Sequence, residues 1–447
     1  MRRYIALICL CLLCLLHISC SRDIVIPDSG QAQVGEQTQV SETDTTEDTQ
    51  EPSTEPDKTL TVLTGNVSDS LVALAEAIER DLGIHTEFET YSFNTPRNSI
   101  LQVRLASRNM PDIFFYQIGS LMYVINPAEN VVDLTDEAFA KVLAEPYIEA
   151  ASIDGKLYSI PGTFSANIYV WLYNRQIYND MGLEPPATWD DFMENCKKIE
   201  SAGITPITAP YQDEWRSQLI FLNDAYNLMS VEPDFPAMLT ANKARYSTTA
   251  PALRSFEKLA EAGRYYDDDY LTLSTTEALR RLLDGEAAHM LYSFRTLDDT
   301  MPTGEPITDY IGFFSQPGDD PDDAGITVWM PDSYYIYKNS PNVEIAKQWL
   351  AYYLSPERID AGNSSSTKLV IDAKSTSDPS DSDIYLAQCI RDGKYVPAIE
   401  FKSPLKGSNC IQICMNVTSG LYDALSGAKA YDQDIERTAI QLGLPGW

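Results

Sequence analysis

The chain has 447 residues, of which 44% are apolar and 22% charged, and its formal net charge is −32 at pH 7. Such an acidic excess argues against a nucleic-acid partner, because no basic surface is available to neutralise phosphates. The apolar share is sufficient for two sizeable hydrophobic cores.

The first 19 residues are typical of an export signal. Arginines at positions 2 and 3 precede an apolar run over residues 5–16 that is too short for an ordinary transmembrane helix. Cys20 follows a small residue, as at the cleavage site of bacterial lipoproteins, where the thiol receives a diacylglycerol. We therefore predict a signal peptide over 1–19 and a lipid on Cys20 that anchors the exported chain to the outer face of the cytoplasmic membrane. His17 stands where that pattern usually has leucine, which leaves a plain signal peptide as the alternative.

Residues 20–58 are predicted to form a disordered acidic linker. Between residues 21 and 58 there is no aromatic residue, and ten acidic residues stand against one arginine and one lysine. Such a segment cannot bury enough apolar surface to offset the entropy of ordering. Charge repulsion would extend it and hold the folded body away from the membrane.

Four cysteines remain in the body, namely Cys196, Cys389, Cys410 and Cys414. A disulfide between Cys389 and either of the last two is compatible with an exported protein. The alternative is that Cys410 and Cys414 are small apolar residues of one helix. These four cysteines form no Cys-x-x-Cys motif and have no partnering histidine that would predict a zinc site.

The folded body begins with alternating strand and helix patterns. The predicted elements are strands over 59–64, 84–91 and 111–116 and helices over 71–82 and 100–107. This order predicts an α/β fold with a largely parallel sheet. Ligands of such sheets bind beyond the carboxyl ends of the strands, which selects Asn66, Tyr116 and Gln117 as candidate contacts.

Helices dominate the rest of the body. Thr188 is a natural N-cap with two aspartates in the first turn, so a helix should run from it to Gly203. The segment 410–442 is expected to form two helices broken at Ser426–Gly427. Other helical patterns lie over 254–262, 276–283 and 343–354.

Four segments in a fixed order resemble a known family. Residues 150–192 read AASIDGKLYSIPGTFSANIYVWLYNRQIYNDMGLEPPATWDDF, with a tight Asp154–Gly155 turn, an apolar strand and a helix start after paired prolines. Later come GEAAHM over 285–290, NSPN over 339–342 and SPE over 355–357. The set resembles the extracellular solute-binding proteins of the maltose and multiple-sugar type, lipoprotein receptors that feed ATP-driven (ABC) importers.

The resemblance implies a periplasmic-binding-protein-like α/β fold with two lobes, a hinge and a ligand cleft between them. Lobe 1 would hold 59–165 and 305–354, and lobe 2 would hold 166–304 and 355–447. The chain would be a monomer that binds a small-molecule ligand, by this likeness a saccharide, and delivers it to the transmembrane subunits of the importer. It would need no cofactor or metal and would catalyse nothing.

Sugar recognition requires aromatic rings for the apolar face of a pyranose and planar polar groups for its hydroxyls. Trp215 is the strongest stacking candidate, because it lies with Tyr211 in a polar loop after a strand over 204–208, with no obvious core to fill. By resemblance, Tyr116 stands where the family often has an aromatic wall, and Asn167 where maltose-type proteins have a polar ligand contact. The alternatives are a core tyrosine and a turn asparagine.

Four further residues complete the candidate set. Tyr292 and Phe294 lie where family members commonly carry Gly-x-Trp. This chain has phenylalanine in place of that tryptophan, so an aromatic ring is kept but the ligand class need not follow the family. Trp329 and Asp332 replace a glycine-rich turn, and Trp329 is either a ligand contact or a shield of the lobe interface. The aspartate clusters over 267–269 and 319–323 are interpreted as solvated loops, since they lack calcium-loop spacing.

Two other functions stay open at this point. An extracellular glycosidase or other hydrolase needs only paired carboxylates near aromatic residues, and product formation would identify it. A surface sensor of the same fold would bind a ligand without transport. Polyamines, phosphate esters and peptides are alternatives to a sugar ligand.

Overall fold

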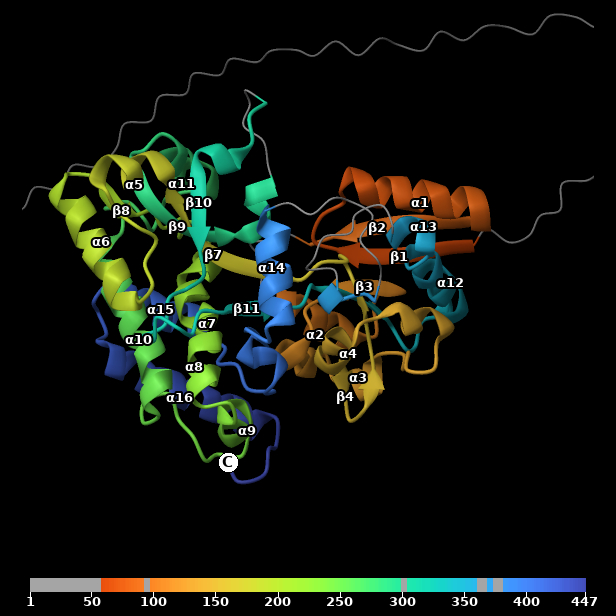
Figure 1. Ribbon diagram of the computed structural model, residues 1–447. Helices are drawn as coiled ribbons and strands as arrows, with labels where there is room; N and C mark the ends of the chain where they lie inside the picture. The colour runs from red at the N-terminus through yellow and green to blue at the C-terminus, as the bar shows by residue number, and fades with distance from the viewer. Residues whose placement is uncertain (1–57, 92–96, 299–303, 360–367, 373–380) are drawn as a thin grey trace, which may run out of the picture. The chain divides into compact units, whose positions relative to one another are not determined.

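The computed structural model describes residues 58–91, 97–298, 304–359, 368–372 and 381–447. The predicted signal peptide, Cys20 and the predicted linker up to residue 57 lie outside these residues. Within them, the strands form two large sheets and a short hairpin (Figure 1).

The first sheet combines parallel and antiparallel strands. In spatial order it consists of β2 (Ile84–Thr90), β1 (Lys58–Thr64), β3 (Ile113–Tyr116), β12 (Ser333–Ile336) and β6 (Ile160–Pro161). β1 is parallel to β2 and β3, with Val62 opposite both Phe88 and Ile113, whereas β12 is antiparallel to β3 and β6. The predicted alternation of strands and helices at the start of the body is therefore confirmed.

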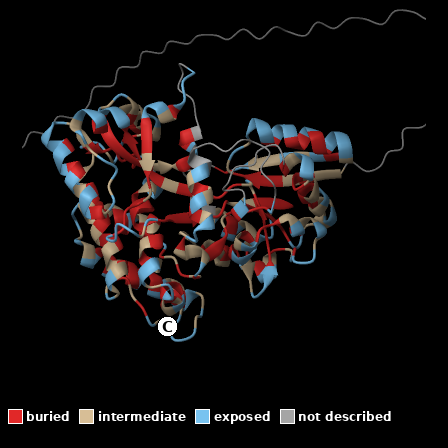
Figure 2. Ribbon diagram, viewed as in Figure 1, coloured by how far each residue is buried: buried red, intermediate tan, exposed pale blue. Residues whose placement is uncertain are grey.

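Local capping explains the helix that follows β1. α1 (Asp69–Leu82) begins where the Ser68 side chain accepts a hydrogen bond from the backbone of Leu71, and it ends at Gly83, whose φ of 64° is left-handed. Its apolar face packs on β2, and Figure 2 shows exposed residues on its outer side. The other helical segments in this part of the chain are α2 (Arg97–Ser107), η1 (Gly119–Ile125), α3 (Pro127–Asn130), η2 (Ala138–Val142), α4 (Glu145–Ala150), α12 (Val343–Tyr353) and α13 (Pro356–Ile359).

The predicted tight turn forms a small hairpin. β4 (Ser152–Ile153) pairs antiparallel with β5 (Lys156–Leu157) across Asp154 and Gly155, whose φ angles are 52° and 75°. Positive φ at both central residues is the geometry that Asp-Gly favours in a two-residue hairpin loop.

The second sheet is built around one long strand. In spatial order it consists of β13 (Tyr395–Pro397), β11 (Ile326–Trp329), β7 (Asn167–Asn174), β9 (Ala287–Ser293) and β8 (Thr205–Ile207), and β10 (Ile311–Phe314) also pairs with β7. β7 is antiparallel to β9, β10 and β11. Its first residues, 167–168, pair with β11, whereas residues 171–174 pair with β10.

The chain passes between the two large sheets at three places, the third of which lies between Ile336 of β12 and Tyr395 of β13. It leaves the first sheet after Pro161 and enters the second at Asn167, and it returns between Trp329 and Ser333. The sequence analysis placed 305–354 in one lobe together with 59–165. Because β10 and β11 pair with β7, residues 311–329 lie instead in the second sheet. The short apolar sequences of β10 and β11 do not indicate which sheet these strands join.

Helices surround the second sheet, and two of them correct the sequence analysis. α15 (Cys410–Thr418) and α16 (Ala424–Gln441) are separated at 419–423, not at Ser426–Gly427. The Asp423 side chain caps α16 by accepting from the backbone of Ser426, 2.7 Å away, so Gly427 lies inside the first turns.

The predicted helix after Thr188 is confirmed as α6 (Trp189–Ser201), with Thr188 and Asp191 forming a capping box. The remaining helical segments are α5 (Arg175–Met181), η3 (Glu214–Gln218), α7 (Leu219–Asn223), α8 (Ala225–Val231), α9 (Phe235–Thr240), α10 (Ala250–Ala262), η4 (Gly263–Tyr265), α11 (Thr275–Leu283), η5 (Phe294–Asp298), η6 (Ile307–Asp309), α14 (Asp381–Arg391) and η9 (Ile399–Phe401).

The four body cysteines are buried free thiols. Cys410 and Cys414 belong to one helix and contribute to the apolar core, as the alternative to a disulfide required. No disulfide is present among the described residues.

Candidate functional site

Three aromatic rings gather on one face of the second sheet. Tyr169 of β7 meets Trp329 of β11 edge to face, with ring centroids 5.2 Å apart, and Trp215 of η3 with centroids 6.4 Å apart. The register explains the first contact, because Trp329 lies opposite Asn167 and is thus the diagonal neighbour of Tyr169. We call Tyr169, Trp215 and Trp329 the aromatic cluster.

Trp215 presents open ring surface. It is 39% exposed, whereas Trp329 is 9% exposed. A large ring left in contact with solvent beside a buried Trp329 and a partly buried Tyr169 is typical of a surface that stacks on a ligand.

Arg216 lies against the aromatic cluster. Its guanidinium carbon is 4.6 Å from the centre of the Trp215 ring and 5.1 Å from that of Tyr292. Its side chain is only 12% exposed, and its Nε atom donates to Asp213 at 3.3 Å. Such stacking holds the planar donors in a fixed orientation.

Burial and nearby charged groups change the pKa of the Tyr169 phenol. Burial raises the pKa of the Tyr169 phenol, Arg216 acts in the opposite direction, and the carboxylates of Asp332 and Glu400 add to the rise. The phenol therefore stays protonated at neutral pH and can donate a hydrogen bond. Glu400 is itself paired with Lys406, Nζ to Oε2, at 2.6 Å.

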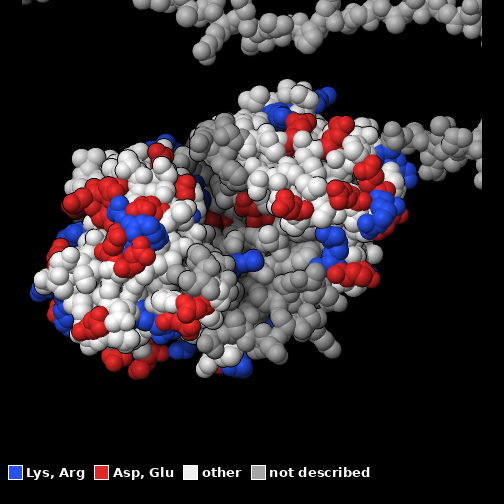
Figure 3. Space-filling view, turned by 90° about the horizontal axis from the view of Figure 1, so that it is seen from above, with Lys and Arg blue, Asp and Glu red and all other residues white. Residues whose placement is uncertain are grey.

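The loop that carries Trp215 and Arg216 is fixed at its start by Asp267. This carboxylate is buried and accepts from the backbone of Ala209 at 3.0 Å and from Arg281 at 2.9 Å. Asp267 was interpreted as part of a solvated cluster, and this is wrong for Asp267 because the carboxylate braces the loop. On the face seen in Figure 3, acidic and basic side chains are interspersed.

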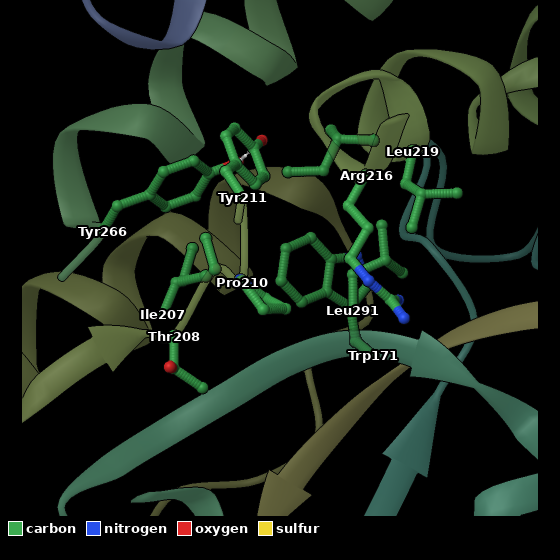
Figure 4. Close-up of a pocket in the computed structure, with 11 residues that line it drawn as sticks. Trp171, Ile207, Thr208, Pro210, Tyr211, Arg216, Leu219, Tyr266 and Leu291 are labelled. Carbon is green, nitrogen blue, oxygen red and sulfur yellow. Dashed lines mark hydrogen bonds between the residues drawn. The ribbon is translucent and has the colours of Figure 1, made fainter. Parts of the chain in front are cut away.

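A pocket lies behind Arg216 (Figure 4). Its walls come from β7, β9, the end of β8 with the loop that follows it, the segment η3–α7 and the residue after η4. They comprise Trp171, Ile207, Thr208, Ala209, Pro210, Tyr211, Arg216, Leu219, Ile220, Tyr266 and Leu291.

Several candidates chosen from sequence meet at this place. Trp215 and Trp329 belong to the aromatic cluster, Tyr292 supports Arg216, and Asn167 pairs with Trp329. Asp332 follows β11 and acts electrostatically on Tyr169.

Other candidates are core residues in this structure. Tyr116 is 0% exposed, and its hydroxyl donates to Asn98 at 2.6 Å. Phe294 is buried against Phe313 and Tyr385. Their rings therefore have no open face for stacking.

The remaining three candidates, Tyr211, Asn66 and Gln117, lie outside the aromatic cluster. Tyr211 is buried, and its hydroxyl is bonded to that of Tyr266 at 3.0 Å, so it only lines the pocket. Asn66 is exposed after β1, and Gln117 is half-buried after β3, where its carbonyl accepts from Tyr335. A ligand role for these two stays a prediction.

The sequence analysis missed Tyr169, Arg216 and Glu400. Alternation along β7 from Asn167 would have selected Tyr169, because residues two apart share a face. The positions of Arg216 and Glu400 depend on tertiary folding and carry no comparable sequence signal.

Residues 64–358, more than half of the chain, match the model of the bacterial extracellular solute-binding protein family. The chain belongs to this family. Over 328 residues it is 23% identical to the melibiose/raffinose/stachyose-binding protein MelE of Bacillus subtilis, covering 67% of this chain and 71% of MelE. It is 26% identical to the multiple sugar-binding protein of Streptococcus mutans over a shorter stretch, 26% of this chain and 28% of that protein.

Solved structures of sugar-binding proteins share the fold. A chitin oligosaccharide binding protein superimposes with a TM-score of 0.69 at 18% identity, over 86% of this chain and 99% of that chain. The binding protein RafE in complex with raffinose gives 0.65 at 17% identity, over 85% and 99%. The predicted two-lobe α/β fold is thereby confirmed.

The described residues contain neither a candidate membrane span nor a candidate metal cluster. No helix there is long and apolar enough to cross a membrane. No group of three or more histidine, cysteine, aspartate or glutamate residues there is placed to hold a metal ion.

Proposed function

We propose that the chain is an exported receptor that binds a saccharide and delivers it to an ABC importer. The aromatic cluster with Arg216 beside it is the observation that carries this proposal. An exposed tryptophan ring suits the apolar face of a pyranose, and the planar donors of Arg216 suit its hydroxyl oxygens.

The named ligands of related proteins support a carbohydrate. MelE is named for melibiose, raffinose and stachyose, and a relative from Halalkalibacterium halodurans for arabinooligosaccharide. Related solved structures include complexes with raffinose and stachyose.

Ligand binding would stabilise a form in which both lobes contact the sugar. Such closure is a population shift, driven by the higher affinity of that form for the ligand. The importer's membrane subunits would recognise the closed form. The receptor itself would act as a monomer without catalysis, tethered through a lipid on Cys20 and the acidic segment over 20–58.

A thermal-shift screen of the purified chain against neutral and acidic oligosaccharides, amino acids and polyamines tests the proposal. A ligand at one hundred times its dissociation constant adds about 2.7 kcal/mol of stability, which is a readable shift. We expect a saccharide to raise the melting temperature and to be recovered unchanged by chromatography. A response confined to another chemical class would refute the saccharide, and recovery of cleaved sugar would establish the hydrolase alternative.

A further inference from the structure

Two residues that line the pocket behind Arg216 carry buried hydrogen-bond donors for which the described part of the chain supplies no acceptor. The Trp171 indole N–H and the Thr208 hydroxyl are 0% and 1% exposed as residues, and neither atom has a hydrogen-bond partner among the described residues. A buried polar group left unpaired costs about 1–3 kcal/mol, so native proteins rarely keep two in one place without a use.

Arg216 adds an incompletely paired cation to the same pocket. Of its side-chain nitrogens, only Nε has a hydrogen-bond partner within the described residues, and this partner, Asp213, is 52% exposed at its side chain. A guanidinium that is largely buried normally has a carboxylate in the fork of its nitrogens. Figure 4 shows the Arg216 side chain beside Trp171 and Leu291.

The two phenols in the wall supply another donor. Tyr211 and Tyr266 share one hydrogen bond between their hydroxyls, which uses one of their two O–H groups. In contrast, no lining residue has a carboxylate or amide side chain. Asp332 and Glu400, the carboxylates that act on Tyr169, are not part of the lining either.

The space matches a small oxygen-bearing group. The cavity has a volume of about 20 Å³, on a scale where one water molecule requires about 10–15 Å³. It therefore has room for one or two oxygen atoms, next to the apolar side chains of Ile207, Leu219 and Leu291.

We infer that this pocket is a subsite for a carboxylate of the ligand, so that the saccharide is an acidic one that contains a uronic acid. The inference rests on the proposed function and narrows its substrate class. The sugar ring would stack on Trp215, and its carboxylate would accept from Arg216 and the buried donors behind it. Planar, bidentate recognition of a carboxylate is the interaction for which arginine is suited and lysine is not.

Calorimetric titration of the full chain with matched sugar pairs tests the inference. Suitable pairs are α-1,4-digalacturonate with α-1,4-galactobiose, and cellobiouronate with cellobiose. We expect the acidic member of at least one pair to bind at least tenfold more tightly than the neutral one. Equal or tighter binding of the neutral members would overturn the inference.

Three variants assign the preference to the pocket. Arg216→Gln should reduce the ratio of the two affinities to about one, and Arg216→Lys should restore it only in part. Thr208→Val, which keeps the side-chain shape, should weaken the acidic sugar several-fold more than the neutral one. Arg280→Gln removes an arginine paired with Glu277, Asp284 and Glu286, and should leave the ratio unchanged.

The possible failures are distinguishable. If neutral sugars bind and the acidic members do not, the carboxylate subsite is wrong and the saccharide receptor stands. If no saccharide of any kind binds, the proposed function fails together with the inference. Melting curves of each variant show that a lost preference is not a loss of folding.

Discussion

His289 shows how a single buried residue couples the fold to pH. Its ring is 0% exposed, with Nδ1 2.8 Å from the carbonyl of Pro206 and Nε2 2.7 Å from the hydroxyl of Tyr178. A carbonyl can only accept, so Nδ1 carries the proton and Nε2 accepts from Tyr178 in the neutral ring. Burial lowers the pKa of His289 from 6.5 to about 4, although the bond to Pro206 opposes the shift.

The depressed pKa predicts a loss of stability in acid. The unfolded chain takes up the proton near pH 6.5 and the folded chain only near pH 4, so the contribution is present above pH 6.5 and is lost between these values. The loss should be about 3 kcal/mol at most, from the shift in pKa. His289→Gln should therefore lose less stability than the wild type between pH 6.5 and 4 in urea unfolding. Parallel pH profiles of the two proteins would contradict this assignment.

Membership of the candidate site could be predicted from sequence only where a local pattern indicated it. Trp215 stood out because a large ring in a polar loop has no core to fill, and the structure leaves it exposed. Tyr116 was chosen from its place at a strand end, yet its ring is in the core. The sequence cannot show which side of a short, fully apolar strand faces a ligand, because alternation is lost there.

At the scale of the single element, Gly427 shows that a glycine does not always end a helix. A Cβ atom at this position would lie 2.4 Å from Cγ2 of Val417 in the preceding helix. The glycine therefore permits the close approach of α15 and α16, while Asp423 marks the true start of α16. The sequence analysis assigned Gly427 to a break because its role depends on a partner helix.

This contact predicts a destabilising substitution at Gly427. Gly427→Ala should lower the unfolding free energy by about 1–3 kcal/mol through overpacking, although alanine favours a helix over glycine by about 1 kcal/mol. Denaturant unfolding measures the change. Adding Val417→Ala should recover part of the loss, because it removes the clashing methyl group; strict additivity of the two substitutions would contradict the packing explanation.

At the scale of the whole molecule, the order of strands and helices could be predicted from sequence. The point at which the chain returns from the second sheet to the first could not. Local periodicity and caps specify β1, α1 and α6, whereas the pairing of β10 and β11 with β7 depends on distant partners. The same holds for the aromatic cluster, which combines residues of β7, η3 and β11.

The proposed lipid anchor makes a prediction for the complete chain. When the chain is expressed in a bacterium, most of it should sediment with membranes and carry a diacylglycerol on Cys20, because one residue supplies the modified thiol. Cys20→Ala should move it to the soluble or secreted fraction. Mass spectrometry of the mature N-terminus provides the direct readout, and an unmodified wild-type N-terminus at another residue would establish the plain signal peptide.

The central claim is that this protein binds a saccharide on the aromatic cluster. The most direct test is calorimetric titration of the wild type and of Trp215→Ala with the saccharide that gives the largest thermal shift. The variant loses the apolar area that the Trp215 ring would bury against the sugar, at about 25 cal/mol per Å², so it should bind about tenfold more weakly. Tyr310→Ala, which removes a comparably exposed ring in the segment after η6, should bind like the wild type. Equal affinity of Trp215→Ala and the wild type would contradict the account.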